Sequence, residues 1–229
     1  MNLSDPMILG AAGDDAQVDA RARFLQKTYT WLCAGVAGFA GILASFEHVP
    51  VLQSLSSTLF GNPIIAIVTL LAASFAAHAL AERSPINVVV YALYVVVFGL
   101  ATAPLVALAD HVAPGIVGQA GLITGIIFGG LTLYVFKTGR DFSFMGGVLA
   151  LGLFAMIALG LGGWLFGFQL GVWYSIAGAL LFSGYILYDT SRILHHYPTT
   201  AHVAAAVVLF TDVVILFQKI LMILLRSRD

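Results

Sequence analysis

Apolar residues in this chain come in runs of about 20 or more, the length that a helix needs to cross ~30 Å of hydrocarbon. Only 9% of the 229 residues are charged and 60% are hydrophobic, so a water-soluble domain could not cover its surface. Backbone polar groups in lipid must be bonded internally, which leaves helices or a closed barrel. Runs such as 64–71 do not alternate as barrel strands do. The sequence predicts an all-α membrane protein.

Hydropathy divides the chain into a tail and a membrane domain. We expect residues 1–22 to form a flexible cytosolic tail, because they hold several aspartates and lack the pattern of a cleavable signal peptide. We expect residues 23–229 to form one transmembrane domain of seven helices. The predicted spans are 24–46, 62–80, 86–109, 115–136, 142–166, 170–194 and 201–225.

The positions of Lys and Arg predict the orientation. With the N-terminus inside, the three outer loops hold no Lys or Arg, as the positive-inside rule requires. A seventh span then leaves Arg226 and Arg228 outside, so six spans followed by a re-entrant segment is the alternative. The net charge of −1 excludes nucleic-acid binding through bulk electrostatics.

Two glycine series mark helix faces. Gly35, Gly38 and Gly41 lie in the first predicted span, and Gly121 and Gly125 begin a four-residue repeat in the fourth that continues to position 129. Helices in lipid associate largely through close approach at small residues. Both series therefore predict tight helix contacts.

Asp189 and Asp212 fall inside the last two predicted spans. An aspartate at mid-membrane costs about 2.5–3.5 kcal/mol on insertion scales and usually faces the protein interior with a partner. The midpoint between the two positions lies within the turn at 197–201, so both carboxylates should lie at one height in an antiparallel hairpin. The spacing allows the two side chains to meet.

Two adjacent carboxylates in a low-dielectric site titrate as a unit. Such a pair can hold one proton, or lose it and attract a cation such as Ca²⁺, which prefers oxygen ligands. The sequence thus indicates a pH-sensing cation site at Asp189 and Asp212. Alternatively, each aspartate separately bonds a neighbour such as Tyr185, Tyr188 or Thr211.

Two arginines are candidate latches for this pair. Arg83 ends the second predicted span on the same side as the hairpin turn, and Arg192 lies one helical turn after Asp189. Either long side chain can reach inward to a carboxylate, although interfacial anchoring explains Arg83 equally well. Lys219 is expected to extend toward the outer interface, and His78 to be hydrogen-bonded.

Four stretches resemble the Bax-inhibitor family in its bacterial YccA-like branch. They are 24–29 (FLQKTY), 137–147 (KTGRDFSFMGG), 184–190 (GYILYDT) and 209–217 (LFTDVVILF), in the family's order. The resemblance covers nearly all of the chain after the tail. One departure is Ile215, where many relatives carry Asn three residues after the second aspartate.

The resemblance implies seven helices with the last one central, and a pH-sensitive Ca²⁺ leak through a bacterial inner membrane. It assigns the gating pair to Asp189 and Asp212 and the latch to Arg83. It implies no enzymatic activity and no cofactor beyond Ca²⁺ as the transported or bound ion.

Three other functions remain open at this stage. The resemblance also implies a regulatory protein that acts on a partner such as a membrane protease. An intramembrane aspartyl protease would use the two aspartates to activate water, but Asp212 lacks the Gly-x-Gly that precedes its second aspartate. A retinal protein would use Lys219, which has no aspartate four residues before it.

Overall fold

Helices make up almost all of the structure, a computed structural model that describes residues 6–81 and 83–227. No strand occurs within those ranges. The elements are α1 (Pro6–Ser45), α2 (Pro50–Phe60), α3 (Pro63–Leu80), α4 (Ile86–Val112), α5 (Ile116–Thr138), the 3-10 turn η1 (Ser143–Met145), α6 (Gly146–Phe166), α7 (Val172–His195) and α8 (His202–Arg226).

Prolines and glycines set the helix ends. Pro50 and Pro63 open α2 and α3, where the missing N–H costs nothing. The side chain of Asn62 also accepts hydrogen bonds from the first backbone N–H groups of α3. Gly139 and Gly167 end α5 and α6 with positive φ angles of 58° and 72°, a conformation that glycine adopts without strain.

Six helices are long and apolar enough to cross a membrane: α1 from Gln17, α3, α4, α5, α6 and α8. The chain is thus an integral membrane protein. Each predicted span corresponds to a helix, but α7 does not reach the same hydropathy, because its inward face carries the aspartate and several hydroxyl groups. The count of seven spans stays a prediction. The loop at 48–61 holds the short helix α2 of 11 residues.

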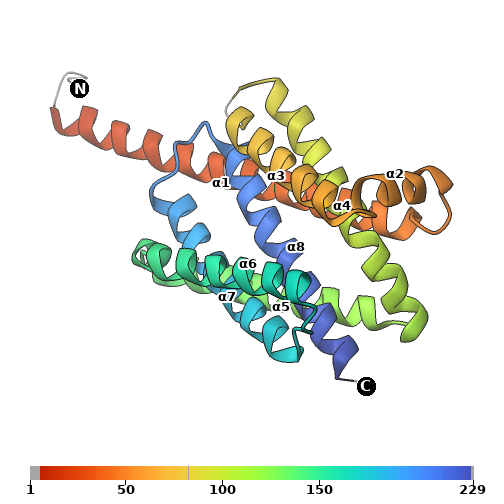
Figure 1. Ribbon diagram of the computed structural model, residues 1–229. Helices are drawn as coiled ribbons and strands as arrows, with labels where there is room; N and C mark the ends of the chain where they lie inside the picture. The colour runs from red at the N-terminus through yellow and green to blue at the C-terminus, as the bar shows by residue number, and fades with distance from the viewer. Residues whose placement is uncertain (1–5, 82, 228–229) are drawn as a thin grey trace.

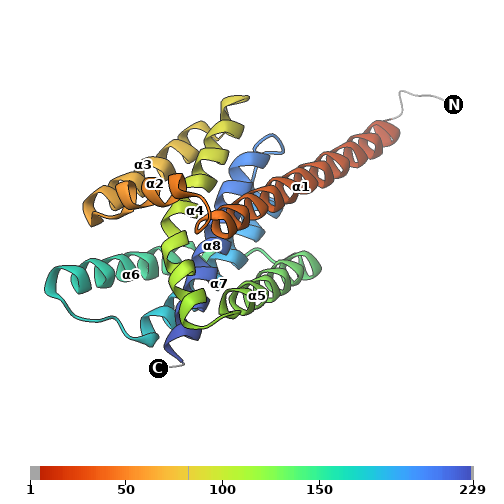
Figure 2. The same cartoon turned by 90° about the vertical axis from the view of Figure 1, so that its right-hand side faces the viewer.

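Helix α8 occupies the centre of the bundle, as Figures 1 and 2 show from two directions. It packs against α1, α3, α4, α5 and α7. Phe210 on α8 is fully buried and makes edge-to-face contacts with aromatic rings of α1 and α4. Helix α6 instead exposes large apolar side chains such as Leu151 and Phe154, each 71% exposed, as a lipid-facing helix does.

Helix α1 extends past the rest of the bundle toward the N-terminus (Figure 2). Its helical backbone begins at Pro6 and includes most of the segment that we expected to form a flexible cytosolic tail. Residues 1–5 lie outside the described residues. The cytosolic and flexible character of 1–22 stays a prediction.

The two glycine series differ, which corrects one expectation. A Cβ on Gly35 of α1 would lie 2.0 Å from the hydroxyl of Tyr91 on α4, so the helices meet there as expected, whereas a Cβ on Gly41 would meet nothing within 4 Å. A Cβ on Gly121, Gly125 or Gly129 of α5 would meet nothing within 4 Å. The prediction of tight contacts on α5 was wrong, because that face opens onto a cleft.

Candidate functional site

Helices α7 and α8 form an antiparallel hairpin joined by the turn at 196–201. We call the side of the bundle with this turn the turn end, and the opposite side the far end. Asp189 lies a little under two helical turns before the end of α7, and Asp212 about three turns after the start of α8. The hairpin places both carboxyl groups inside the helix interface, at similar height.

The carboxyl groups of Asp189 and Asp212 lie within hydrogen-bonding distance of each other. Asp189 is 6% exposed and Asp212 is 4% exposed. Because the site holds little water and the two groups are adjacent, ionising both carboxyl groups at once costs much free energy. The arrangement can therefore hold one proton between two oxygens.

No N–H or O–H group of the described residues donates to Oδ2 of Asp212, although that oxygen is buried. A nearby hydroxyl, on Thr211, is already engaged, because it lies 2.8 Å from the Tyr94 hydroxyl and donates to the Val207 carbonyl. A buried acceptor without a donor costs about 1–3 kcal/mol. A shared proton or a bound cation can remove that cost.

The structure places the two candidate latches differently. The guanidinium of Arg192 lies over the rings of Tyr188 and Tyr197, at 5.3 and 5.7 Å, and is near enough to act on Asp189 electrostatically. Arg83 is exposed at the end of α3. Within the described part of the chain, neither arginine makes a direct ion pair with an aspartate of the site.

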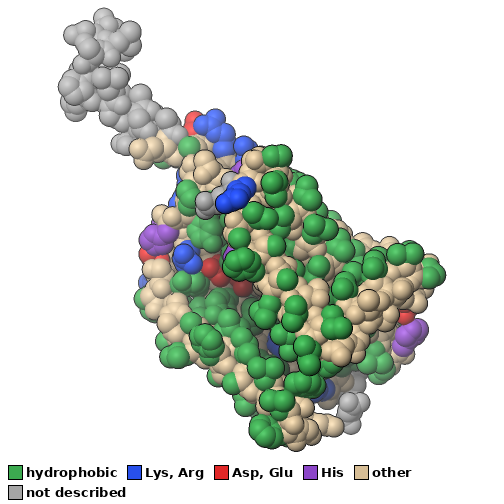
Figure 3. All heavy atoms as spheres, turned by 45° about the horizontal axis from the view of Figure 1, so that its top comes forward, with side chains coloured by type: hydrophobic (Ala, Val, Ile, Leu, Met, Phe, Trp, Pro, Cys, Tyr) green, Lys and Arg blue, Asp and Glu red, His purple; other side chains and the backbone are tan. Residues whose placement is uncertain are grey.

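A cavity of about 290 Å³ leads inward from the turn end beside Arg192. Val207 and Val208 of α8 line it one turn before Asp212, together with Tyr197 and His196. Figure 3 shows atoms of acidic side chains, drawn in red, that lie recessed in a hollow of this face among hydrophobic and basic side chains. The cavity thus reaches to about one helical turn from Asp212, and its lining includes neither aspartate.

The residues described contain no group of three or more His, Cys, Asp or Glu side chains that could hold a metal. The pair supplies two carboxyl groups, so a Ca²⁺ ion there would take its other ligands from water or carbonyl oxygens.

The loop between α5 and α6 is fastened to the end of α7, a contact that the sequence analysis missed. Asp141 accepts hydrogen bonds of 2.8 Å from the Ser143 backbone N–H and from His196 Nε2. The Phe142 N–H donates to Ser191 Oγ at 3.0 Å. Sequence showed the histidines and the loop separately, without a signal that joins them. These bonds fix the helix end that carries Asp189.

Replacing Asp141 with Asn should lower the unfolding temperature slightly at pH 7, on the order of 1–3 °C for an exposed pair. The Ser143 hydrogen bond, followed by that of His196, lowers the pKa of Asp141 to about 2. Its contribution is thus fully present above about pH 4 and is lost as pH falls toward 2. Thermal unfolding in detergent should show the difference between the two proteins shrinking as pH falls and largely gone at about pH 2; an undiminished difference there would exclude this role.

Two further side chains that the sequence analysis singled out, His78 and Lys219, can be located. His78 donates from Nδ1 to the Ser74 carbonyl at 2.7 Å, so the expected bonded histidine is confirmed. The ammonium of Lys219 lies 4.5 Å from the centre of the Tyr174 ring, and its methylenes pack near Gly178. Lys219 is therefore bound within the α7–α8 interface toward the far end, in a cation–π contact.

Comparison with known proteins places nearly the whole chain in one group. The family model described as "Inhibitor of apoptosis-promoting Bax1" matches residues 21–229. A Golgi anti-apoptotic protein of Vaccinia virus is 28% identical, covering 97% of this chain and 93% of its own. Protein lifeguard 4 of Mus musculus is 29% identical over 96% and 92%. An uncharacterized protein of Campylobacter jejuni is 30% identical over 88% and 87%.

Proposed function

Because the chain belongs to the Bax-inhibitor family, we propose that it is a pH-sensitive Ca²⁺ leak channel gated by Asp189 and Asp212. The contact between the two carboxyl groups inside the α7–α8 interface carries this proposal. It makes proton binding a property of the pair. It also places the pair on α8, the helix that packs against most of the bundle.

The proton on the pair controls the gate in this mechanism. With one proton shared, the two side chains hold α7 and α8 together and the site has little attraction for a cation. Loss of that proton leaves two carboxylates that repel each other and attract Ca²⁺. The hairpin then separates enough for the ion to pass along α8.

An arginine modulates that step. Arg192 is the basic residue positioned to act on Asp189 in this conformation, and it stands beside the turn-end cavity. Arg83, which the family resemblance suggested, is exposed here and would have to move to reach the pair in another state. Both arginines would oppose cation entry from the turn end and favour the unprotonated pair.

The turn end faces the cytosol in this proposal. Lys and Arg gather on that side and are absent from the loops at 46–62 and 110–115, as the positive-inside rule requires. The N-terminus is then cytosolic. A bacterial inner membrane fits the bacterial relative, although the similar proteins also include viral and mammalian ones.

Ca²⁺ flux into proteoliposomes tests the proposal. Vesicles with the purified protein should admit Ca²⁺ faster than empty vesicles, and the rate should change severalfold between about pH 6 and about pH 8, as protons leave the pair. A parallel assay with K⁺ reports ion selectivity. Rates equal to those of empty vesicles would refute the leak, and a rate independent of pH would refute the gate.

A second candidate is regulation of cell survival or of a membrane protease through a protein partner. The names of similar proteins, "Golgi anti-apoptotic protein" among them, favour it. Residues 1–20 are the part to delete, because the described part of α1 before Arg21 extends away from the bundle (Figure 2), whereas Arg21 itself donates to the Leu194 and Tyr197 carbonyl groups at the turn end and is retained. A truncated protein with normal flux but without its effect in cells would separate this role from transport.

A further inference from the structure

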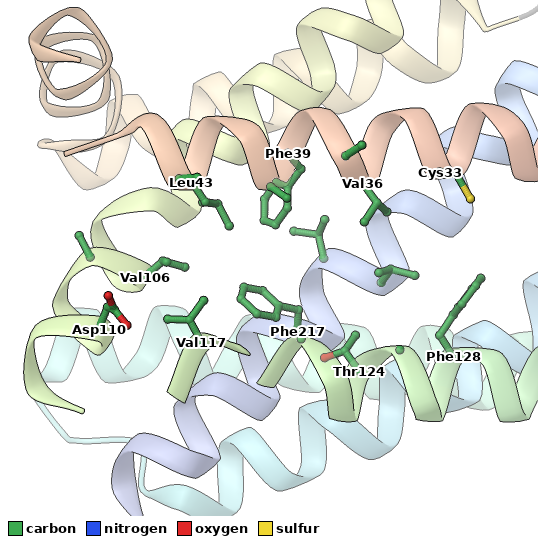
Figure 4. Close-up of a pocket in the computed structure, with 18 of the residues that line it drawn as sticks. Cys33, Val36, Phe39, Leu43, Val106, Asp110, Val117, Thr124, Phe128 and Phe217 are labelled. Atoms are coloured by element: carbon green, nitrogen blue, oxygen red, sulfur yellow. The ribbon is translucent and has the colours of Figure 1, made fainter. Parts of the chain in front are cut away.

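A large cleft lies between α1 and α5, away from the aspartate pair. Its volume is about 820 Å³. In Figure 4, Val36, Phe39 and Leu43 enter it from α1, and Val117 and Phe128 from α5. Helix α8 forms its floor, through Val213, Val214 and Phe217.

The lining of this cleft suits a hydrocarbon chain rather than water. Nearly all lining side chains are apolar, and Gly121 and Gly125 leave open space in which a Cβ would meet nothing. Protein interiors are otherwise close-packed, and the apolar walls of this cleft offer an ordered water few hydrogen-bond partners. Both walls are helices with the length and hydropathy of membrane spans, so the occupant comes from the bilayer.

The far-end mouth of the cleft is acidic. Glu47, His48 and Asp110 line it. The segments that join α1 to α3 and α4 to α5 contain no Lys or Arg. His111 lies 2.7 Å from Glu47, and Asp110 accepts a hydrogen bond from the backbone N–H of Gly115. The mouth therefore repels an anionic headgroup and attracts a cationic one.

We propose that this cleft binds a phospholipid with a primary ammonium headgroup, of which phosphatidylethanolamine is the type. One acyl chain lies along α8 between α1 and α5, and the ammonium lies at Glu47 and Asp110. A primary ammonium donates three hydrogen bonds, and such charge-assisted bonds to carboxylates are strong. The quaternary ammonium of phosphatidylcholine donates none, and phosphatidylglycerol is anionic.

The lipid would support the helix that carries half of the aspartate pair. Successive helical residues differ by about 100° in direction. Val213, Val214 and Phe217 thus lie about 100–200° around α8 from Asp212, on the opposite side of the helix. An acyl chain there fills the space into which α8 would otherwise shift.

Native mass spectrometry of the full chain in detergent tests the site, with dioleoyl lipids of the three headgroups. One phosphatidylethanolamine should bind, about tenfold more tightly than phosphatidylglycerol. Gly125→Leu fills the cleft and should weaken that binding about tenfold. Gly130→Leu is the matched control, because Gly130 is exposed on the same helix, has equally open space and lies outside the cleft.

Headgroup selection has its own variant. Glu47→Gln with Asp110→Asn should remove the preference, so that phosphatidylethanolamine and phosphatidylcholine bind the variant about equally. Thermal unfolding of every variant reports folding, and Gly121→Leu replaces Gly125→Leu if the latter does not fold. Equal binding of all three lipids, or wild-type binding by the folded cleft variant, would refute the proposal.

A second copy of the chain is the other possible occupant of the cleft, and Cys33 distinguishes it. Cys33 is the single cysteine and lines the cleft. Bound phosphatidylethanolamine should slow its alkylation by a maleimide, more in wild type than in Gly125→Leu. Dimers that Gly125→Leu abolishes, with no lipid retained by the monomer, would assign the cleft to protein association and refute the lipid site.

Discussion

Replacing Asp212 with Asn is expected to make Ca²⁺ flux nearly independent of pH. A shared proton changes its occupancy by up to about tenfold per pH unit, and an amide cannot take part in that exchange. The amide introduced by Asp212→Asn would donate permanently to Asp189, as the shared proton does in the protonated pair. We therefore expect a variation of less than about twofold between pH 6 and pH 8, at the rate of the protonated wild type.

Asp189→Asn should also make Ca²⁺ flux nearly independent of pH. Its flux rate should differ from that of Asp212→Asn. Asp189 is the partner on which Arg192 acts, whereas Asp212 lies deeper, with an oxygen that no described group donates to. Loss of the Asp189 charge leaves Arg192 without its nearest carboxyl group. Asp19→Asn is the control, because Asp19 is an exposed carboxyl group on α1.

Folding and transport must be separated in these variants. A buried carboxyl without a donor destabilises the fold, so Asp212→Asn should unfold at a temperature at or above that of the wild type. A well-folded Asp212→Asn and a well-folded Asp189→Asn that both keep the wild-type pH profile would exclude the pair as the proton sensor. Proteoliposome flux and thermal unfolding on the same preparations decide this.

The sequence predicted the long helices and the height of the aspartates because both depend on local periodicity. A mean helical rise and a turn at 197–201 suffice to place Asp189 beside Asp212. The side chains meet because both helices turn these residues inward, which buries Asp212 at 4% exposure. Helical spacing alone could not distinguish that orientation from two aspartates bonded separately.

Contacts between distant segments were less predictable. The bond between Asp141 and His196 joins residues 55 positions apart, and neither residue type nor spacing marks such a pair. Arg83 and Arg192 were both candidate latches in sequence, but the structure leaves Arg83 exposed and brings Arg192 near enough to act on Asp189. A long side chain reaches its partner through tertiary packing, which the sequence pattern does not encode.

Glycine spacing has the same ambiguity. Gly35 and Gly125 both belong to regular series on apolar helices, yet only Gly35 lies against a neighbouring helix. Small residues permit close approach without requiring it. Whether a partner helix arrives depends on the packing of the whole bundle around α8, so the cleft beside Gly125 was not predictable from the repeat.

Replacing Gly35 with Ala should therefore destabilise the protein by about 1–3 kcal/mol, the cost of overpacking a tight contact. The new Cβ would lie 2.0 Å from the Tyr91 hydroxyl and 3.3 Å from the ring of Phe210. Tyr91 is 3% exposed, and its hydroxyl donates to the Trp31 carbonyl, so the ring cannot turn away freely. In lipid, loss of close approach between α1 and α4 removes a main source of helix association.

Gly38→Ala is the matched control, three residues along the same helix. Its Cβ would lie 3.5 Å from Val95, an ordinary contact, so the better helix propensity of alanine should leave stability unchanged or raise it by up to about 1 kcal/mol. Thermal or denaturant unfolding in detergent compares the two. A Gly35→Ala protein as stable as Gly38→Ala would show that α1 does not approach α4 as closely as the structure has it.

A double substitution locates the cause of the Gly35→Ala effect. Tyr91→Phe removes the atom nearest to the new Cβ, and the next ring atom, Cζ, lies at 2.8 Å. Alone, it should cost about 1 kcal/mol through the lost bond to Trp31. Combined with Gly35→Ala, it should cost less than the sum of the single effects, because one clash is shared. Strict additivity would mean that the Gly35→Ala loss arises elsewhere, since a clash between these two side chains must couple them.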